Sequence, residues 1–553
     1  MNKFVITVFA IFSSLFSTGQ NRLTSSNLPI VVIDTEGKTI SADDKISANM
    51  KIIFNGEGQQ NFVDDKHFDY EGFIGIRMRG NSSLSFAQKQ YAVETRDDAG
   101  KNLNVSLLGM PKDNDWVLYA PYNDISLIRN VYAYTLWNEM GHWGPRTKMV
   151  EVILNGDYQG VYVLLESIKR DKNRIDVPKL EFADTSGLNI TGGYIMKIDD
   201  AKDDDLTFIS KVSGIQTSSG WGGWGGWGGG TSNNNIEWIY HYPKAEDIHP
   251  KQAEYIHNYI DTVELLIQSP NYNDQQVGYA KYLDVQSFVD YLIHTELSLN
   301  ADGYKKSSFF FKERLALDGS GGKFFAGSVW DYNLAFGNCN FCNGNVTTSW
   351  VYNGCTTLPV PAFWKRLVQD PKFMDEVKCR YLELRKNVLS QEHIEAFIDD
   401  YALLLDEAQE RHFAKWNKLF DGKDQSLTWF SAYSVSSYAQ EIQTLKNWFA
   451  ERLAFIDANL SGSCVLSSAN NDISIVDVWV YPNPVSNRLV VESTKQLKSI
   501  EIYNMSGTLM STINFLNANQ TVVEELNNYS KGIYKLLIYT VDGSCVSKSV
   551  LKQ

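Results

Sequence analysis

The chain has 553 residues, of which 43% are hydrophobic and 21% charged, a balance that excludes a largely disordered protein. At roughly 150 residues per domain, this length predicts about two to four domains. The formal net charge of −14 disfavours nonspecific binding to nucleic acid, which requires basic surface to replace the counterions of the phosphates. We therefore expect no nucleic-acid partner.

The first residues have the pattern of a secretory signal peptide. In MNKFVITVFAIFSSLFSTGQ one lysine precedes an apolar run of about a dozen residues, and small and polar residues follow. We assign residues 1–20 to this signal, and a buried N-terminal strand is the alternative. No later run reaches the roughly 18 apolar residues of a membrane span, so we expect an exported protein whose mature form has no transmembrane segment.

Strands dominate the next part of the chain. LPIVVIDT and MKIIFNG are β-branched runs, and FIGIRMRGNSSLSFAQKQYAVETRD predicts two strands joined by a polar loop. ISLIRNVYAYTLWNEMG has the apolar spacing of a helix that ends at Gly141. TKMVEVILNGDYQGVYVLLESI predicts a hairpin with NGD at its turn, and GGYIMKID predicts one more strand.

Residues 218–235, SSGWGGWGGWGGGTSNNN, form a low-complexity insertion. Glycine dominates it, so the segment cannot hold a packed core by itself. Trp221, Trp224 and Trp227 recur at every third position. The insertion is either a flexible link between strands or an adhesive aromatic patch.

Helices dominate the second half of the main domain. LDVQSFVDYLIHTELSLN (283–300) is amphipathic, GKFFAGSVWDYNLAFG is strand-like, and residues 361–460 are largely helical. A Ser/Asn-rich linker at 461–474 precedes residues 475–553, whose short alternating strands predict a small all-β sandwich. Strands first and helices later indicate an α+β domain at 28–455, in which a small sheet lobe faces a larger helical lobe.

Six cysteines are compatible with disulfides in an exported protein. They are Cys339, Cys342, Cys355, Cys379, Cys464 and Cys545. The first three cluster in CNFCNGNVTTSWVYNGC, where a zinc site would need a fourth ligand and no histidine lies nearby. We expect a disulfide within this loop that uses Cys355.

The lobe layout is that of kinase-like phosphotransferases. Such enzymes need a polar loop and a cation to hold the phosphates, one carboxylate to orient the acceptor hydroxyl and a second to hold magnesium. In RMRGNSSLSFAQKQYAVE, backbone N–H groups of the loop that starts at Gly80 can hold an anion, and Arg79 and Lys89 flank it. A plain hairpin with solvated basic residues is the alternative.

Three carboxylates follow in chain order. Glu166 closes an apolar strand, where it either pairs with a cation of the site or lies at a strand edge. Asp302 lies on a helix-to-strand loop, where catalytic carboxylates are common, although Asn300 and Asp302 also fit a helix cap and a turn. Asp331 ends the apolar run KFFAGSVW and is the candidate magnesium ligand, and Asn333 points to the same face if the strand continues.

Several of these segments together resemble the spore-coat CotH kinase family from about residue 28 to 455. They are RGNSSLSFAQKQYAVE, DWVLYAPYNDISLIRN, NGDYQGVYVLLESIKRDKNRID, GGYIMKID, NADGYKKSSFFFKE and GSVWDYNLAFGN. The resemblance implies an atypical protein-kinase-like fold that transfers phosphate from ATP, with Mg²⁺ or Mn²⁺, to Ser/Thr of secreted or surface proteins. It matches Lys89 to the phosphate-contacting lysine, Asp302 to the catalytic aspartate and Asp331 to the metal-binding aspartate. It also matches Arg79, Asn81 and Ser82 to the polar loop of the family. Glu166 matches a recurrent glutamate to which no fixed role is assigned.

Two positions depart from the family pattern. Ser307 stands where many relatives have Asn, and Asn333 stands where some have Asp. Both changes weaken metal ligation, so the alternative is a surface adhesion or matrix-assembly protein on a catalytically silent kinase fold. A hydrolase is disfavoured because no Ser-His-Asp order, paired carboxylates or HExxH spacing stands out.

The C-terminal region resembles a type IX secretion C-terminal sorting domain. The matching segments are VYPNPVSNRLVVES, IEIYNMSGTLM and KGIYKLLIYT. The resemblance implies passage through the outer membrane of a Gram-negative bacterium with the type IX machinery as a partner. Attachment to the cell surface or release then follows.

Overall fold

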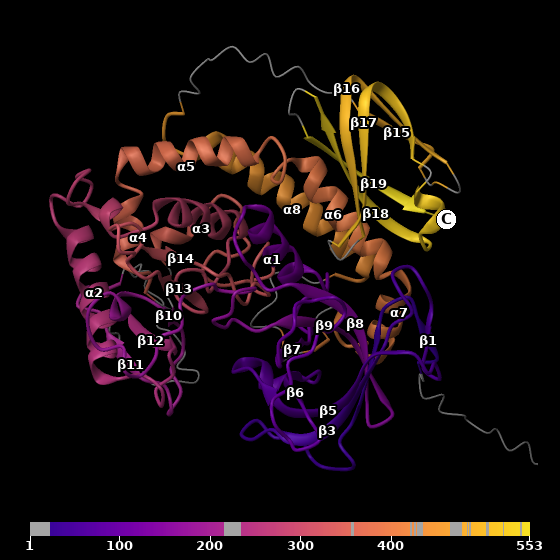
Figure 1. The fold of residues 1–553 in the computed structure, drawn as a ribbon, viewed down its shortest axis with the longest axis horizontal. Coiled ribbons are helices and arrows are strands. Elements are labelled where there is room, and N and C mark those ends of the chain that lie inside the picture. Colours follow the sequence, from indigo (N-terminus) through magenta and orange to yellow (C-terminus); the bar gives the residue numbers. More distant parts are fainter. Residues whose placement is uncertain are drawn as a thin grey trace, which may run out of the picture.

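A computed structural model gives the fold of most of the chain (Figure 1). The predicted signal peptide, the three tryptophans of the insertion, Cys355 and the linker beyond Cys464 lie outside the described residues. Within the described part, no helix is both long and apolar enough to cross a membrane. The structure describes residues 23–214, 234–354, 359–420, 423–424, 427, 435–464, 478–483, 485, 488–504, 508–523, 525–541 and 545–552.

The first strands close into a seven-stranded barrel. In order around the barrel they are β2 (Ile30–Asp34), β3 (Ile46–Ile53), β5 (Phe68–Arg79), β6 (Gln90–Arg96), β7 (Asp115–Tyr119), β9 (Asp157–Glu166) and β8 (Thr147–Leu154). Closure is made by β2 and β8, which pair in parallel, whereas the other neighbours are antiparallel. Alternate apolar residues such as Ile74, Ile76 and Val152 fill the interior.

A second, five-stranded antiparallel sheet lies beside the barrel. Its order is β11 (Thr207–Ile209), β12 (Glu237–Tyr242), β10 (Tyr194–Ile198), β13 (Ser308–Lys312) and β14 (Phe324–Ala326). The strand expected to run on to Trp330 is shorter than predicted, because Gly327 adopts a φ of +110° and ends the extended chain. A Cβ at Gly327 would lie 2.7 Å from the ring of Trp137, so only glycine fits this turn.

Helices cover the sheets and carry the rest of the core. They are α1 (Arg129–Glu139), α2 (Pro250–Gln268), α3 (Val285–Ser298), α4 (Ala362–Leu367), α5 (Pro371–Leu384), α6 (Gln391–Leu404), α7 (Asp406–Lys415) and α8 (Tyr438–Asn459). Side chains of Asp284, Asp370, Ser390 and Ser437 cap α3, α5, α6 and α8 by accepting backbone N–H groups. The mixture of sheets and helices that we expected is confirmed, but the kinase-like two-lobe layout is not, because the first sheet closes into a barrel.

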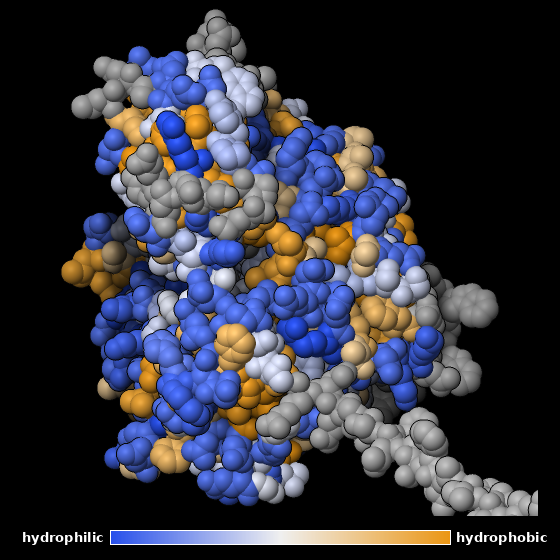
Figure 2. Space-filling model, turned by 90° about the vertical axis from the view of Figure 1, so that its right-hand side faces the viewer, coloured by the Kyte–Doolittle hydropathy of each residue, from blue (hydrophilic) through white to orange (hydrophobic). Residues whose placement is uncertain are grey.

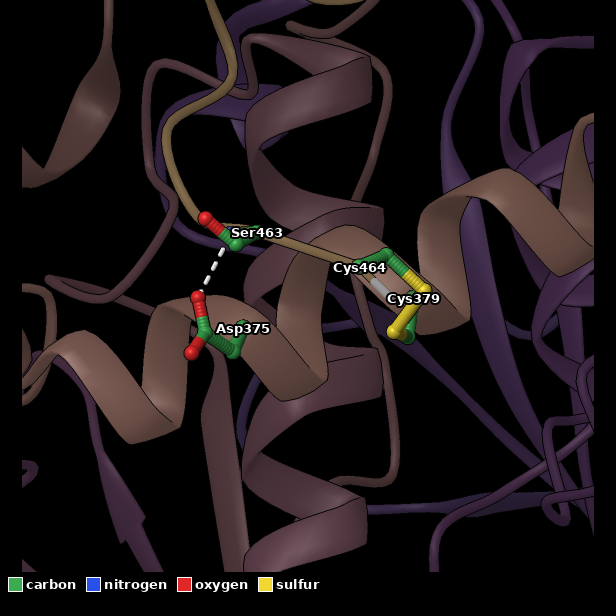
Figure 3. The surroundings of a disulfide bond; sticks show 4 residues. All are labelled: Asp375, Cys379, Ser463 and Cys464. Atoms are coloured by element: carbon green, nitrogen blue, oxygen red, sulfur yellow. Dashed lines mark hydrogen bonds between the residues drawn. A yellow bond between two sulfur atoms is a disulfide. The ribbon is translucent and has the colours of Figure 1, made fainter. Parts of the chain in front are cut away.

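A disulfide that we did not predict joins Cys379 on α5 to Cys464, beyond the end of α8 (Figure 3). Beside it, the backbone N–H of Ser463 donates to the carboxylate of Asp375. Cys342, in the predicted cysteine-rich loop, is also disulfide-bonded, whereas Cys339 and Cys545 are free. The described end of the main domain is therefore held against α5.

The C-terminal region is all-β, as expected, but its strands are joined in one sheet and not in the two sheets of the predicted sandwich. Its strands are β15 (Val478–Tyr481), β16 (Leu489–Asn504), β17 (Leu509–Val523), β18 (Gly532–Thr540) and β19 (Cys545–Lys552). They form one sheet, because β16 pairs with β15 through its first half and with β18 through its second half. Register shifts near Leu497 lie between these two halves, and apolar residues such as Ile500 and Leu536 form the core of the region.

The C-terminal region packs against the main domain across a cleft lined by both. Lys535 on β18 lies 3.6 Å from Glu139 on α1, and Gly58 lies so close to Lys531 that a Cβ there would meet its carbonyl oxygen. Residues of the barrel and of the C-terminal region together line the cleft, among them Glu57 and Tyr534.

Figure 2 shows the face turned to the viewer as largely hydrophilic with small apolar areas.

Candidate active site

Sheet order brings the two aspartates of the prediction to one edge. Asp302 lies on the loop between α3 and β13, and Asp331 lies on the loop after β14. Strands β13 and β14 are antiparallel neighbours, so the start of the first and the end of the second lie at the same edge. The two carboxylates lie close enough for the charge of Asp302 to raise the pKa of Asp331.

Asp199 and Asp200 join this edge, and the sequence reasoning did not single them out. Both follow β10, whose last residue Ile198 pairs with Ser308 at the start of β13. The signal that could have found them is the pair of aspartates directly after the strand GGYIMKI. That strand ends at the same edge of the sheet as the loop that carries Asp302. Four carboxylates therefore lie at one sheet edge.

Burial and mutual repulsion perturb the aspartates of this cluster. Burial raises the pKa of Asp331 to about 7, and the charges of Asp302 and Asp199 add to this while Arg79 and Lys306 oppose it. Burial also raises the pKa of Asp302, with Lys305 and Lys306 acting against the rise. Because a nearby cation would relieve this repulsion, the cluster is suited to positive charge.

Arg79 is the cation that the barrel contributes. It is the last residue of β5, its guanidinium carbon lies 5.1 Å from the centre of the Trp330 ring, and it attracts the Asp331 carboxylate. The backbone N–H of Asp331 donates to the hydroxyl of Tyr134 on α1 at 3.1 Å. These contacts fix the position of Asp331 between the barrel and the second sheet.

Two lysines follow Asp302 and take different positions. The Nζ of Lys306 lies 2.6 Å from Oδ2 of Asp200, and the amide of Asn81 donates to the same oxygen at 3.0 Å. Lys305 is buried, and burial lowers its pKa to about 8 although Asp302 opposes the change. The lysines thus place one ammonium group on the exposed side of the cluster and one on its buried side.

The polar loop has the expected turn but a different use of its lysine. Gly80 has a φ of +117°, and residues Ser82–Ser85 form a short 3₁₀ helix. Lys89 lies directly before β6, and its Nζ donates to the carbonyls of Leu84 and Phe86 at 2.7 and 2.6 Å. Lys89 therefore closes the loop from within, and no hydrogen bond joins it to the aspartate cluster in the described part of the chain.

Glu166 pairs with cations that lie outside the predicted set. It is fully buried at the end of β9, and Arg146 binds it through two guanidinium nitrogens at 2.8 and 2.9 Å. Arg174 lies 3.6 Å away on the other side. The structure gives Glu166 these two partners, and no ion pair joins it to the aspartate cluster or to Lys89 among the described residues.

Asn333 was expected to share a face with Asp331 only if the strand continued, and this condition is not met, because no strand continues through Asp331. Asp331 has a φ of +62°, which turns the chain at this point. The amide of Asn333 donates to Oδ1 of Asn123 at 3.2 Å, while its own buried Oδ1 has no hydrogen-bond partner among the described residues. Ser307 lies directly before β13, also with positive φ (+48°).

The donor set fits a hard divalent cation only in part. Among the described residues, no group of three or more His, Cys, Asp or Glu side chains is arranged to hold a metal ion. Mg²⁺, however, commonly takes one or two protein carboxylates and completes its shell with water and substrate phosphates. The carboxylates of Asp302 and Asp331 are oxygen donors of this kind. The side-chain oxygen of Asn333, which lies on the same loop as Asp331 and has no hydrogen-bond partner among the described residues, is a third.

Comparison with known proteins assigns both parts of the chain. Residues 76–456 match the family model described as CotH kinase protein, and residues 479–552 match the secretion system C-terminal sorting domain. A search of the curated proteins finds no match. The sorting domain implies interaction with the type IX machinery and export to the cell surface or beyond, as in Gram-negative Bacteroidetes. Since the first match covers more than half of the sequence, the chain belongs to the CotH kinase family and is an exported member of it.

Proposed function

We propose that this protein transfers the γ-phosphoryl group of ATP to serine or threonine hydroxyls of secreted or surface proteins. The observation that carries the proposal is the pair Asp302 and Asp331 at one sheet edge, with the barrel's Arg79 stacked over Trp330 and attracting the Asp331 carboxylate. A base, a metal-binding carboxylate and a phosphate-binding cation are the parts that phosphoryl transfer requires.

Each group has a role in the proposed reaction. Asp302 orients the acceptor hydroxyl and takes its proton, and its raised pKa makes it a better base than an ordinary aspartate. Arg79 and Lys306 supply positive charge for the phosphates. The bond from the acceptor oxygen to the γ-phosphorus forms as the bond to the bridging oxygen breaks, and ADP leaves.

A divalent cation would complete this arrangement. Asp331 would hold it, with Asn333 as a neutral oxygen donor, and Mg²⁺ or Mn²⁺ would neutralise charge on the phosphates. Lys89 acts indirectly in this scheme, because its ammonium group closes the polar loop that covers the phosphates. Ser307 contributes at most a neutral hydroxyl.

The first test is nucleotide binding. Millimolar ATP with Mg²⁺ or Mn²⁺ should raise the melting temperature, because a ligand at 100 times its Kd stabilises the folded state by about 2.7 kcal/mol. An unchanged melting temperature with either metal would refute the proposal.

The second test is transfer itself. Labelled phosphate should pass to a generic basic protein, and both Asp302→Ala and Asp331→Ala should abolish the label. Asp204→Ala is the matched control, because Asp204 is exposed on the loop that follows β10. Nucleotide binding without any transfer would favour the catalytically silent fold, whose surface function would then be adhesion or matrix assembly.

A further inference from the structure

Asp200 connects three loops at the candidate active site. It follows β10, and a single oxygen of its carboxylate accepts hydrogen bonds from two other loops. The polar loop contributes the amide of Asn81 at 3.0 Å, and the loop after α3 contributes the Nζ of Lys306 at 2.6 Å. None of these contacts lies within one element, so the bridge sets how the three loops approach one another.

The two donors are of the kind that binds a phosphate oxygen. An ammonium group and an amide N–H both form charge-assisted hydrogen bonds with anionic oxygens, whether these belong to a carboxylate or to a phosphate. Asn81 stands in the loop proposed to cover the phosphates, and Lys306 stands in the loop of the proposed base, Asp302. The carboxylate of Asp200 therefore occupies a position that suits a phosphate oxygen.

The bridge is accessible enough to be exchanged. The side chain of Asp200 is 47% exposed and that of Lys306 is 28% exposed. Ion pairs at this exposure contribute little to stability because water and salt screen them. A multiply charged phosphate chain can therefore displace Asp200 at small cost.

We infer that Asp200 is an affinity-determining residue, which holds Lys306 and Asn81 as an internal anion and competes with a nucleotide phosphate for both. This inference rests on the proposed function, since it names a further residue of the same nucleotide site. A purely structural role predicts the opposite effect, because loss of a structural contact weakens binding.

The test is a comparison of the full chain with Asp200→Ala, Lys306→Met and the double variant. Calorimetric titration with Mg·ATP should show Asp200→Ala binding about three- to tenfold more tightly than the wild type, the range expected when a screened ion pair and a nearby like charge are removed. The effect should disappear in the Lys306→Met background. Asp204→Ala, which removes the same charge from an exposed position on the same loop, should leave the affinity within about twofold.

A second measurement follows the bridge without nucleotide. Hydrogen exchange of residues 80–86 should be faster in Asp200→Ala than in Asp204→Ala, because only the first variant releases Asn81. Wild-type binding with no gain in Asp200→Ala, or a gain that persists without Lys306, would overturn the inference alone. Failure of the wild type to bind Mg·ATP at all would overturn the proposed function and this inference with it.

Discussion

Asp331→Asn should make the metal-free protein more stable at alkaline pH while it abolishes phosphoryl transfer. The substitution keeps the size of the side chain and removes the charge that lies near Asp302 and Asp199. Asparagine also tolerates the left-handed backbone at this position, where φ is +62°. Catalysis and stability are thus expected to change in opposite directions at one residue.

The magnitude follows from the pKa of Asp331, which is raised from 3.8 to about 7. Between these values the folded protein keeps a proton that the unfolded chain has released, so stability falls as the pH rises and the loss is complete above about pH 7. One pKa unit corresponds to about 1.36 kcal/mol, which gives at most about 4 kcal/mol. Partial exposure screens the charge, so we expect about 1–2 kcal/mol, or a rise of about 2–5 °C in melting temperature.

The assay is thermal unfolding in EDTA at pH 8 and at pH 5, with Asp204→Asn as the control. At pH 5 the folded wild type keeps the proton on Asp331 while the unfolded chain, whose pKa is 3.8, has largely released it, so only the loss between pH 3.8 and pH 5 applies and roughly two thirds of the advantage of the variant should vanish. A variant that melts no higher than the wild type at pH 8 would refute the reasoning. An equal gain at both pH values would also refute it, because charge would then not be the cause.

Two further predictions concern stability away from the aspartate cluster. Because the Cys379–Cys464 disulfide closes a chain separation of 85 residues, replacing both cysteines by serine should lower the free energy of unfolding by about 2–4 kcal/mol in denaturant titrations, and an unchanged midpoint would contradict this. Glu166→Gln should lower the free energy of unfolding by about 2–3 kcal/mol, because it removes the anion that pairs with Arg146 and Arg174 at a fully buried position. The loss is at the lower end for a buried ion pair because Arg146 is partly exposed, so that water screens its charge. Glu71→Gln, which removes one partner of an exposed ion pair, should cost less than about 0.5 kcal/mol in the same titration, and equal losses would show that burial is not decisive.

The positions of the strands and helices along the chain could be predicted from the sequence, but which strands pair with each other could not. Alternation in runs such as VVID and IGIRM shows which side chains point inward, because side chains alternate across a strand. It does not show that β2 meets β8, a parallel pairing between residues 30–33 and 151–154 that closes the barrel. An open sheet and a closed barrel bury the same alternating residues, so the sequence pattern is equal for both.

The same limit explains what was predicted of the candidate site. Asp302 and Asp331 could be found because a carboxylate near an apolar run stands out, and the family resemblance supplied their roles. Asp199 and Asp200 escaped because their position depends on β10 lying next to β13. The partner of Glu166 was open for a similar reason, since a buried glutamate requires a cation without specifying which one.

The charges at the sheet edge bear on the form in which a nucleotide would enter. Four carboxylates lie there, against the three cations Arg79, Lys306 and the buried Lys305, so negative charge is in excess. Free ATP would add further negative charge to a cluster in which burial and repulsion already raise the pKa of Asp331. A cation that arrives with the phosphates reverses this balance, because it attracts Asp331 while it reduces the charge presented to Asp200. Under the proposed function, the metal–nucleotide complex is therefore the ligand that this site favours, and the excess of carboxylates is what selects it over the free nucleotide.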